Sequence, residues 1–351
     1  MNEKNLLDVR DLSVHFRRGS RSPALRAVDG VSFTVAERET LGVVGESGSG
    51  KTTIGRAVLG LVSPTDGQIE FDGEDITHAD YRRRLGLSRE LQVIFQDPYS
   101  SLNPTRTIAQ TLSESLRSQR LSKDEVRDRS IAMLERVGLP ATSADRYPSS
   151  FSGGQRQRIA IARALIVQPR LVICDEPVSA LDLSVQAQVL NLLRELQDEF
   201  ALSYLFVAHD LDVVRHLSHR IMVLYRGQIM EQGPAEAVYA SPKHPYTRTL
   251  LEAAPVPDPV RQAERRSQRV RARDTTGPIP VAGCPFATRC PHATSLCHTE
   301  RPRLEQTSAG TTVACHWWRD VSGETSDATA ANTPLRLGDP VADSAVPHKS
   351  L

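Results

Sequence analysis

A glycine-rich loop between a buried strand and a helix is the feature that most constrains the fold of this chain. Residues 45–52 read Gly-Glu-Ser-Gly-Ser-Gly-Lys-Thr and match the pattern G-x-x-x-x-G-K-[ST]. The apolar run at 41–44 precedes the loop as a buried strand would, and residues 52–61 follow it with helical spacing. Glycines let consecutive backbone N–H groups surround phosphate oxygens, next to the positive end of the following helix. We therefore expect a loop that binds phosphate groups.

Two side chains of the loop suit a nucleotide with its magnesium ion. Lys51 can neutralise the β- and γ-phosphates, and the Thr52 hydroxyl can bind Mg²⁺. The alternative is a glycine-rich loop without a ligand, but the strand before it and the helix after it argue against that. The predicted phosphate-binding residues are Gly45, Ser47, Gly48, Ser49, Gly50, Lys51, Thr52 and Thr53.

Short apolar runs alternate with helical patterns over the first 240 residues. The runs at 171–174, 204–207 and 221–225 indicate buried strands, with a helix at 182–200 between the first two. This order favours a parallel sheet with helices on both faces. Two consecutive helices within 107–137 interrupt the alternation and predict a helical insert. Other strands are expected at 12–16, 31–35, 68–71 and 91–95, and other helices at 107–120, 123–137 and 154–167.

Two carboxylates end one of the buried strands. Asp175 and Glu176 follow the run at 171–174, and ligands of α/β sheets bind at the carboxyl ends of the strands. Asp175 could therefore hold Mg²⁺, directly or through water, and Glu176 could polarise a water against the γ-phosphate. Two acids in a solvated turn are the alternative, which the phosphate loop in the same sheet disfavours.

Composition limits the class of protein and divides the chain. The 351 residues carry a net charge of +1, which gives no reason to expect nucleic-acid binding. No apolar run approaches the roughly 18 residues of a membrane helix, and the first residues lack the apolar region of a signal peptide.

Residues 1–241 hold 9 prolines and residues 242–351 hold 13, together with four of the five cysteines. We expect a soluble domain followed by a proline-rich appendage.

A set of motifs in order makes the prediction specific. The segment Phe151-Ser152-Gly153-Gly154-Gln155 alone could be no more than a helix N-cap with a flexible turn. Taken with the other motifs, it makes residues 6–240 resemble the nucleotide-binding subunit of ABC transporters. The motifs that carry the resemblance are residues 45–52, Gln96, residues 151–155, Asp175-Glu176, Ser179-Ala180-Leu181-Asp182 and His209.

The resemblance implies a role for each matching residue. Phe16 would stack on adenine, and Gln96 would contact Mg²⁺ or the attacking water and sense the membrane partner. Residues 152–155 would close over the γ-phosphate of ATP held by a partner subunit, and Asp182 would help to form the dimer seam. His209 would contact the γ-phosphate and hold the water in line. The implied catalytic residues are Glu176, His209 and Gln96. The implied Mg²⁺ ligands are Thr52, Gln96 and Asp175. The resemblance adds to the ATP site the residues Phe16, Ser152, Gly153, Gly154, Gln155 and Asp182.

The appendage resembles the C-terminal extension of peptide and nickel importer ATPases. The residues concerned are His244-Pro245-Tyr246-Thr247, Gly283-Cys284-Pro285-Phe286, Arg289-Cys290-Pro291 and Cys315-His316. Together with residues 95–104 and 176–182, they look most like the second of the two ATPase subunits of that subfamily.

Four cysteines of the appendage can form one metal centre. Their spacing is Cys284-x5-Cys290-x6-Cys297-x17-Cys315, without the Cys-x2-Cys pairs of zinc ribbons. A shared centre requires the four sulfurs to converge on one point. The resemblance implies a [4Fe–4S] cluster; the alternatives are Zn²⁺, with His292, His298 and His316 as spare ligands, and free thiols or disulfides. Cys174, in a predicted buried strand, is interpreted as a core residue.

The expected fold is an α/β P-loop NTPase of the ABC cassette type, in which a parallel sheet is joined by an antiparallel β subdomain and a helical insert. The ATPase domain would span residues 1–250, with the insert at about 97–165. A Pro/Arg-rich linker would span 251–283, the Cys-cluster extension 284–318 and a disordered tail 319–351. The arginines between residues 261 and 273 suit a solvated linker, or contact with anionic headgroups or a neighbouring subunit.

The expected function is ATP hydrolysis that powers the import of peptides, or of a related small solute, through an ABC transporter. Its partners would be a second ATPase subunit, for which the subfamily resemblance favours a different chain, two membrane permeases and a solute-binding protein acting through them, at the cytoplasmic face of the membrane. Nucleic acid is not expected as a partner. The alternatives are a soluble ABC ATPase acting on ribosomes or in DNA repair, and a nickel or glutathione importer ATPase.

Overall fold

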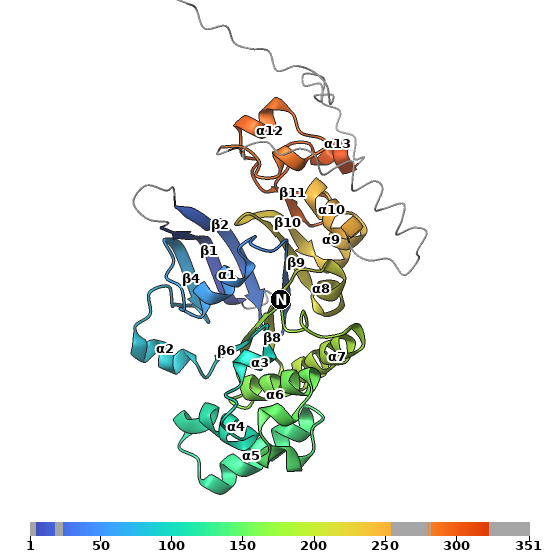
Figure 1. Ribbon diagram of the computed structural model, residues 1–351. Helices are drawn as coiled ribbons and strands as arrows, with labels where there is room; N and C mark the ends of the chain where they lie inside the picture. Colours follow the sequence, from blue (N-terminus) through green and yellow to red (C-terminus); the bar gives the residue numbers. More distant parts are fainter. Residues whose placement is uncertain (1–4, 18–23, 254–279, 281, 323–351) are drawn as a thin grey trace, which may run out of the picture.

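The computed structural model describes residues 5–17, 24–253, 280 and 282–322 (Figure 1). Within these residues, the larger of two sheets has eight strands in the order β11-β12-β10-β9-β3-β8-β7-β6. The five strands from β9 to β6 are parallel to their neighbours, as the alternation of strands and helices predicts, whereas β10, β12 and β11 are antiparallel. The strands are β3 (Thr40–Val44), β6 (Leu91–Ile94), β7 (Leu171–Asp175), β8 (Ser203–Ala208), β9 (Arg220–Tyr225), β10 (Gln228–Pro234), β11 (Glu305–Gln306) and β12 (Thr312–Val313).

The smaller sheet is antiparallel and has the order β2-β1-β4-β5. The strand expected at 12–16 is only the second half of β1, because register shifts break the strict alternation and Asp11 takes a φ of 48°. The expected strands at 31–35 and 68–71 lie within β2 and β4. The strands of this sheet are β1 (Asn5–Phe16), β2 (Leu25–Ala36), β4 (Asp66–Phe71) and β5 (Glu74–Asp75).

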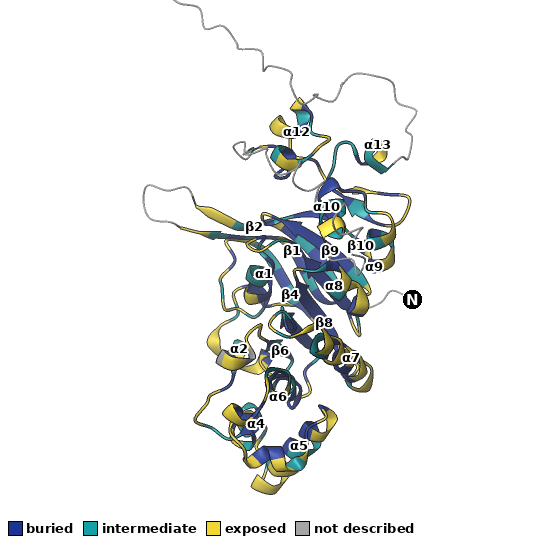
Figure 2. Cartoon of the chain, turned by 45° about the vertical axis from the view of Figure 1, so that its right-hand side comes forward, coloured by how far each residue is buried: buried dark blue, intermediate teal, exposed yellow. Residues whose placement is uncertain are grey.

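The helices cover the main sheet and form an insert between β6 and β7. Figure 2 shows the central strands buried and the outer sides of α2, α4 and α5 exposed. None of the described helices combines the length and the apolar character that crossing a bilayer requires. The α-helices before the extension are α1 (Lys51–Val58), α2 (Tyr81–Leu87), α3 (Pro98–Ser101), α4 (Ile108–Leu116), α5 (Lys123–Arg136), α6 (Gly153–Leu165), α7 (Leu183–Phe200), α8 (Leu211–Leu217), α9 (Ala235–Ala240) and α10 (Pro245–Ala253). The 3₁₀ turns before the extension are η1 (Arg117–Gln119), η2 (Ala141–Asp145) and η3 (Pro148–Ser150).

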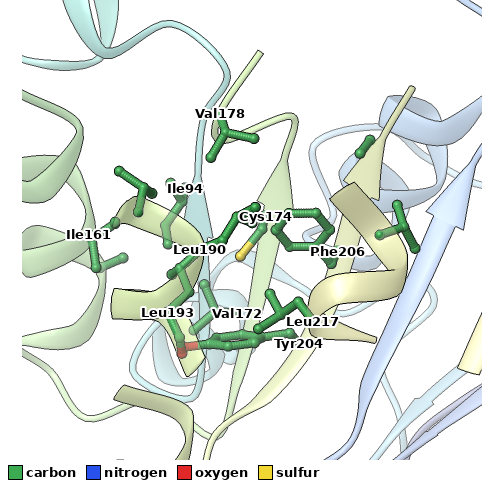
Figure 3. Packing of buried hydrophobic residues seen from close by; sticks show 14 of the residues in the cluster. Ile94, Ile161, Val172, Cys174, Val178, Leu190, Leu193, Tyr204, Phe206 and Leu217 are labelled. Atoms are coloured by element: carbon green, nitrogen blue, oxygen red, sulfur yellow. The ribbon is translucent and has the colours of Figure 1, made fainter. Parts of the chain in front are cut away.

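The central strands are buried on both faces, which explains their continuous apolar runs. On β7, Leu171 and Ile173 belong to one hydrophobic cluster, and Val172 and Cys174 belong to the other. Figure 3 shows Cys174 among the residues of the second cluster, beside Phe206. Cys174 is fully buried, and burial raises the pKa of its thiol. The core role expected for this cysteine therefore agrees with its surroundings.

The C-terminal extension adds strands to the main sheet. β12 pairs with β10 and β11 pairs with β12, both antiparallel, so the extension is joined to the sheet edge. Its other elements are η4 (Ala287–Arg289), α12 (Ser295–Thr299) and α13 (Trp318–Ser322). Most of the expected linker, including the arginines at 261–273, and the expected tail beyond residue 322 lie outside the described residues.

Candidate nucleotide site

The phosphate loop lies between β3 and α1, and at two of its glycines a larger side chain would not fit. At Gly45 an added Cβ would lie 2.1 Å from the Leu224 carbonyl oxygen. Gly50 has a φ of 106°, and a Cβ there would lie 2.2 Å from the Ala27 oxygen. No side chain caps the N-terminus of α1, so its first backbone N–H groups face the loop without a side-chain acceptor. The geometry suits an anion held by backbone amides.

Lys51 is buried against the loop. Its Nζ donates hydrogen bonds to the carbonyl oxygens of Gly45 at 2.7 Å and Glu46 at 3.0 Å. It also lies 3.9 Å from Oε1 of Glu176. Burial lowers the pKa of Lys51, while the carboxylates of Glu176 and Asp175 act in the opposite direction. The lysine charge is thus held inside the loop where phosphates are expected.

Thr52 and Asp175 meet where a magnesium ion is expected. The Thr52 hydroxyl donates to Oδ1 of Asp175 at 2.8 Å, so the start of α1 faces the carboxyl end of β7. Burial raises the pKa of Asp175, and the hydrogen bond from Thr52 opposes that shift. One hydroxyl and one carboxylate are the hard oxygen donors with which proteins hold Mg²⁺ beside a phosphate. The donor set fits the ion.

Glu176 is the centre of the predicted catalytic group. Gln96 Nε2 donates to Oε2 of Glu176 at 3.2 Å, and Nδ1 of His209 lies 3.7 Å from the same oxygen. The Glu176 backbone has a φ of 49°, the left-handed region that glycine favours and that other residues occupy mainly under local constraint. The structure therefore brings all three predicted catalytic residues together, next to Lys51.

The segment 152–155 and Asp182 are not hydrogen-bonded to this group within the described residues. Ser152 caps α6 by accepting the Gln155 N–H at 3.3 Å, and Gln155 Oε1 accepts the Ser152 N–H at 3.0 Å. Asp182 caps α7, accepting from Val185 N at 3.0 Å. The N-cap interpretation of the segment is thus present in the structure, and it leaves Ser152 and Gln155 exposed.

Phe16 lies at the end of β1, and the residue is 41% exposed. Within the described part of the chain, no aromatic ring packs against it. The side chain is therefore accessible to a flat partner such as a nucleobase.

The four cysteines of the extension border one cavity. Its lining also includes His244, His292 and His316. Burial raises the pKa of Cys284 to about 11 and those of Cys290 and Cys315 to about 12. All five cysteines of the chain are free thiols. No three His, Cys, Asp or Glu side chains in the described ranges are arranged to hold one metal ion, so the expected convergence on a single point is not met.

Two residues outside the predicted site contact the phosphate loop. Arg289 pairs with the carboxylate of Glu46, and the Tyr246 hydroxyl accepts the Glu46 N–H. Both belong to motifs that the sequence shows, at residues 244–247 and 289–291, but nothing in those motifs indicates which part of the cassette they touch.

The family comparisons agree with this geometry. The ABC transporter family matches residues 28–179, and the family described as "Oligopeptide/dipeptide transporter, C-terminal region" matches residues 230–297. The chain belongs to the ABC transporter ATPase subunits. It carries, after the ATPase domain, the C-terminal region that characterises the oligopeptide/dipeptide branch.

Curated relatives match over most of the chain. A putative peptide import ATP-binding protein of Brucella ovis is 50% identical over 317 residues, covering 90% of this chain and 98% of the relative. The oligopeptide transport ATP-binding protein OppF of Salmonella typhimurium is 48% identical over 311 residues, covering 86% and 93%. A putative oligopeptide transport ATP-binding protein of Bacillus subtilis is 44% identical over 319 residues, covering 90% and 96%.

Solved structures share the cassette fold. CbiO1 of Clostridium perfringens, part of an ABC transporter complex, aligns with a TM-score of 0.61 and 28% identity over 68% of this chain and 92% of its own. The cassette MJ0796, in a dimeric post-hydrolysis state with ADP and Pi, aligns with a TM-score of 0.60 and 27% identity over 65% and 98%. The chain is therefore an ABC-type ATPase.

Proposed function

We propose that this chain hydrolyses ATP to power the import of peptides through a membrane ABC transporter. The observation that carries the proposal is the group around Glu176, set beside a complete phosphate loop in a chain whose C-terminal region matches the oligopeptide/dipeptide branch. The names of the relatives, which are peptide import and oligopeptide transport ATP-binding proteins, support the substrate class.

Each residue of the site has a part in hydrolysis. Lys51 would neutralise the phosphates, and Thr52 and Asp175 would hold the magnesium ion, which would withdraw charge from the phosphate oxygens. Glu176 takes the proton of the attacking water, because its carboxylate lies 3.9 Å from Nζ of the loop lysine, beside the expected position of the γ-phosphate. His209 and Gln96, both beside Oε2 of Glu176, orient that water.

A second ATPase subunit completes the site in this proposal. The exposed Ser152 and Gln155 present their side chains at the N-terminus of α6, where a γ-phosphate from the partner subunit would be favoured. Asp182 is exposed, and Leu183 beside it is 84% exposed, which suits residues that an interface covers.

Membrane permeases would dock beside Gln96 and the helical insert. Phe95, Tyr99 and Tyr147 are exposed aromatic side chains in this part of the chain, and aromatic residues are enriched at protein interfaces. Two permease subunits would carry the solute across the membrane, with a solute-binding protein acting through them. The chain would then act at the cytoplasmic face as a peripheral subunit.

We also propose that Cys284, Cys290, Cys297 and Cys315 hold a [4Fe–4S] cluster. The support is that all four thiols border one cavity. A [4Fe–4S] cluster takes one thiolate for each iron, and these four cysteines supply that number.

Metal analysis of anaerobically purified protein tests the cluster. We expect about four irons per chain and a brown colour that Cys290→Ser removes and Cys174→Ser keeps. A colourless protein with stoichiometric zinc would replace the cluster with the alternative ion, and a metal-free protein would overturn both.

Peptide uptake tests the function. In cells that lack the endogenous gene, the wild-type chain should restore uptake of a radiolabelled tripeptide, and Glu176→Gln should not. Uptake of ⁶³Ni²⁺ serves as the matched comparison. Restored nickel uptake without restored peptide uptake would refute the peptide assignment while leaving the ATPase intact.

A further inference from the structure

The C-terminal extension reaches the phosphate loop through one arginine. Nη1 and Nη2 of Arg289 donate to the two carboxylate oxygens of Glu46 at 2.9 and 3.0 Å. Nη1 also lies 3.3 Å from the Tyr225 hydroxyl on β9. Glu46 is the second residue of the loop, so the pair joins two segments that lie 243 positions apart. This bidentate geometry fixes the relative orientation of the two side chains as well as the distance between them.

A tyrosine before the extension contacts the same loop residue. The Glu46 backbone N–H donates to the hydroxyl of Tyr246 at 2.8 Å, and Tyr246 is fully buried. The turn just before α10, the helix that contains Tyr246, is held by Glu231 of β10. The buried Glu231 carboxylate accepts the N–H groups of Lys243 and His244 at 2.8 and 2.9 Å. The main sheet therefore sets the position of the hydroxyl.

Glu46 is held at all its polar groups. Tyr246 binds its N–H, Lys51 binds its carbonyl oxygen at 3.0 Å, and Arg289 binds its carboxylate. The phosphate-facing amides follow directly after Glu46 in the loop. Fixing this residue on three sides therefore limits the conformations that the loop can take before a nucleotide arrives.

One aromatic cluster connects these contacts with the cysteine-lined cavity. The Tyr225 and Tyr246 rings lie 4.6 Å apart between centroids, and Phe286 lies 5.4 Å from Tyr225 and 5.3 Å from Tyr246. Phe286 also lines the cavity of the four cysteines. The loop contacts are thus part of the same packed unit as the extension.

Simple attachment of the extension does not require the Arg289 pair. A second pair, between Arg301 and Asp29 at 2.9 Å, also joins the extension to the cassette, and β12 is paired with β10. Exposed ion pairs add little to stability, and the Arg289 and Glu46 side chains are 39% and 42% exposed. The Arg289–Glu46 pair differs from the other attachments of the extension in that it contacts the phosphate loop.

We infer that Arg289 and Tyr246 are positioning residues that act through Glu46 to hold the phosphate loop in its nucleotide-binding shape. The inference rests on the proposed ATPase function and assigns the extension a direct part in it. A loop shaped in advance binds its ligand more tightly, because less conformational freedom is lost on binding.

Titration of the purified full-length chain with fluorescent mant-ATP and Mg²⁺ tests the inference. Arg289→Met should raise the Kd by about threefold to tenfold, the worth of one or two net hydrogen bonds. Arg301→Met is the control, since it also removes an ion pair between the extension and the cassette but leaves every contact of Glu46 in place, and it should stay within about twofold of wild type. Both variants should unfold at similar temperatures.

Two further variants show whether the effect passes through Glu46. The double variant Glu46→Gln/Arg289→Met should lose no more affinity than Arg289→Met, because contacting residues are not additive. Tyr246→Phe should weaken binding about threefold or more, because it leaves the Glu46 N–H without its acceptor.

The outcomes separate this inference from the proposed function. Wild-type affinity in Arg289→Met, or an equal loss in Arg301→Met, would overturn the positioning role while leaving the ATPase proposal in place. A wild-type chain that bound no mant-ATP would overturn the proposed function itself.

Discussion

Ser152 has a structural role that can be separated from its proposed contact with a γ-phosphate. It forms a capping box with Gln155 at the start of α6, with hydrogen bonds of 3.3 and 3.0 Å. Ser122 forms the same reciprocal pair with Glu125 at the start of α5, with bonds of 3.2 and 2.8 Å. The two caps differ in that only Ser152 belongs to the segment predicted to meet ATP.

The exposure and hydrogen-bond lengths of the two N-caps determine how much stability each alanine variant should lose. Replacing a serine N-cap by alanine costs about 1 kcal/mol, and both caps are exposed with similar bond lengths. Ser152→Ala and Ser122→Ala should therefore lower the melting temperature equally, by about 1–2 °C for a chain of this size.

The ATPase rate of the assembled transporter should separate the two variants. Ser152→Ala should lower it by about tenfold or more, because a hydroxyl donor to a transferring phosphate acts where charge develops. Ser122→Ala should keep the wild-type rate. Equal rates in the two variants, whether both reduced or both normal, would refute the assignment of Ser152 to the ATP site.

Three further outcomes are expected. Glu176→Gln should keep mant-ATP binding and lose about 10²–10⁴-fold in ATPase rate, as for removal of a positioned base; a rate near wild type would exclude that role. Thr52→Val should raise the Mg²⁺ concentration for half-maximal ATPase about tenfold, because the hydroxyl that meets Asp175 is lost; an unchanged Mg²⁺ titration would argue against this ligand. Glu231→Ala should lower the free energy of unfolding in urea by about 2–5 kcal/mol, since two buried N–H groups lose their acceptor, and a loss below 1 kcal/mol would contradict the burial argument.

Sequence patterns predicted the strands and helices whose positions depend on nearby residues. The central strands followed from their apolar runs, and α5, expected at 123–137, spans Lys123–Arg136 because Ser122 and Gly138 mark its ends. The helix α2 was missed, because Tyr81–Leu87 holds three arginines and only Leu87 is buried, which leaves no apolar periodicity to detect.

Contacts between distant segments could not be predicted in the same way. The carboxylate at Glu176 was found because the sheet brings strand ends together, a rule that applies to any α/β fold. No such rule places Arg289 on Glu46 or β12 on β10. Those pairings depend on how the extension folds back, which neither spacing nor periodicity records.

The pairing of β12 with β10 has a consequence for how the chain must be made. β10 ends at Pro234, and β12 begins at Thr312, so the cassette strands leave the ribosome well before the strand that covers their edge. Until then β10 offers unpaired N–H and C=O groups to any other extended segment. Truncated or nascent chains that end after α10 should therefore associate through this edge, and completion of the chain should protect the cassette against that association.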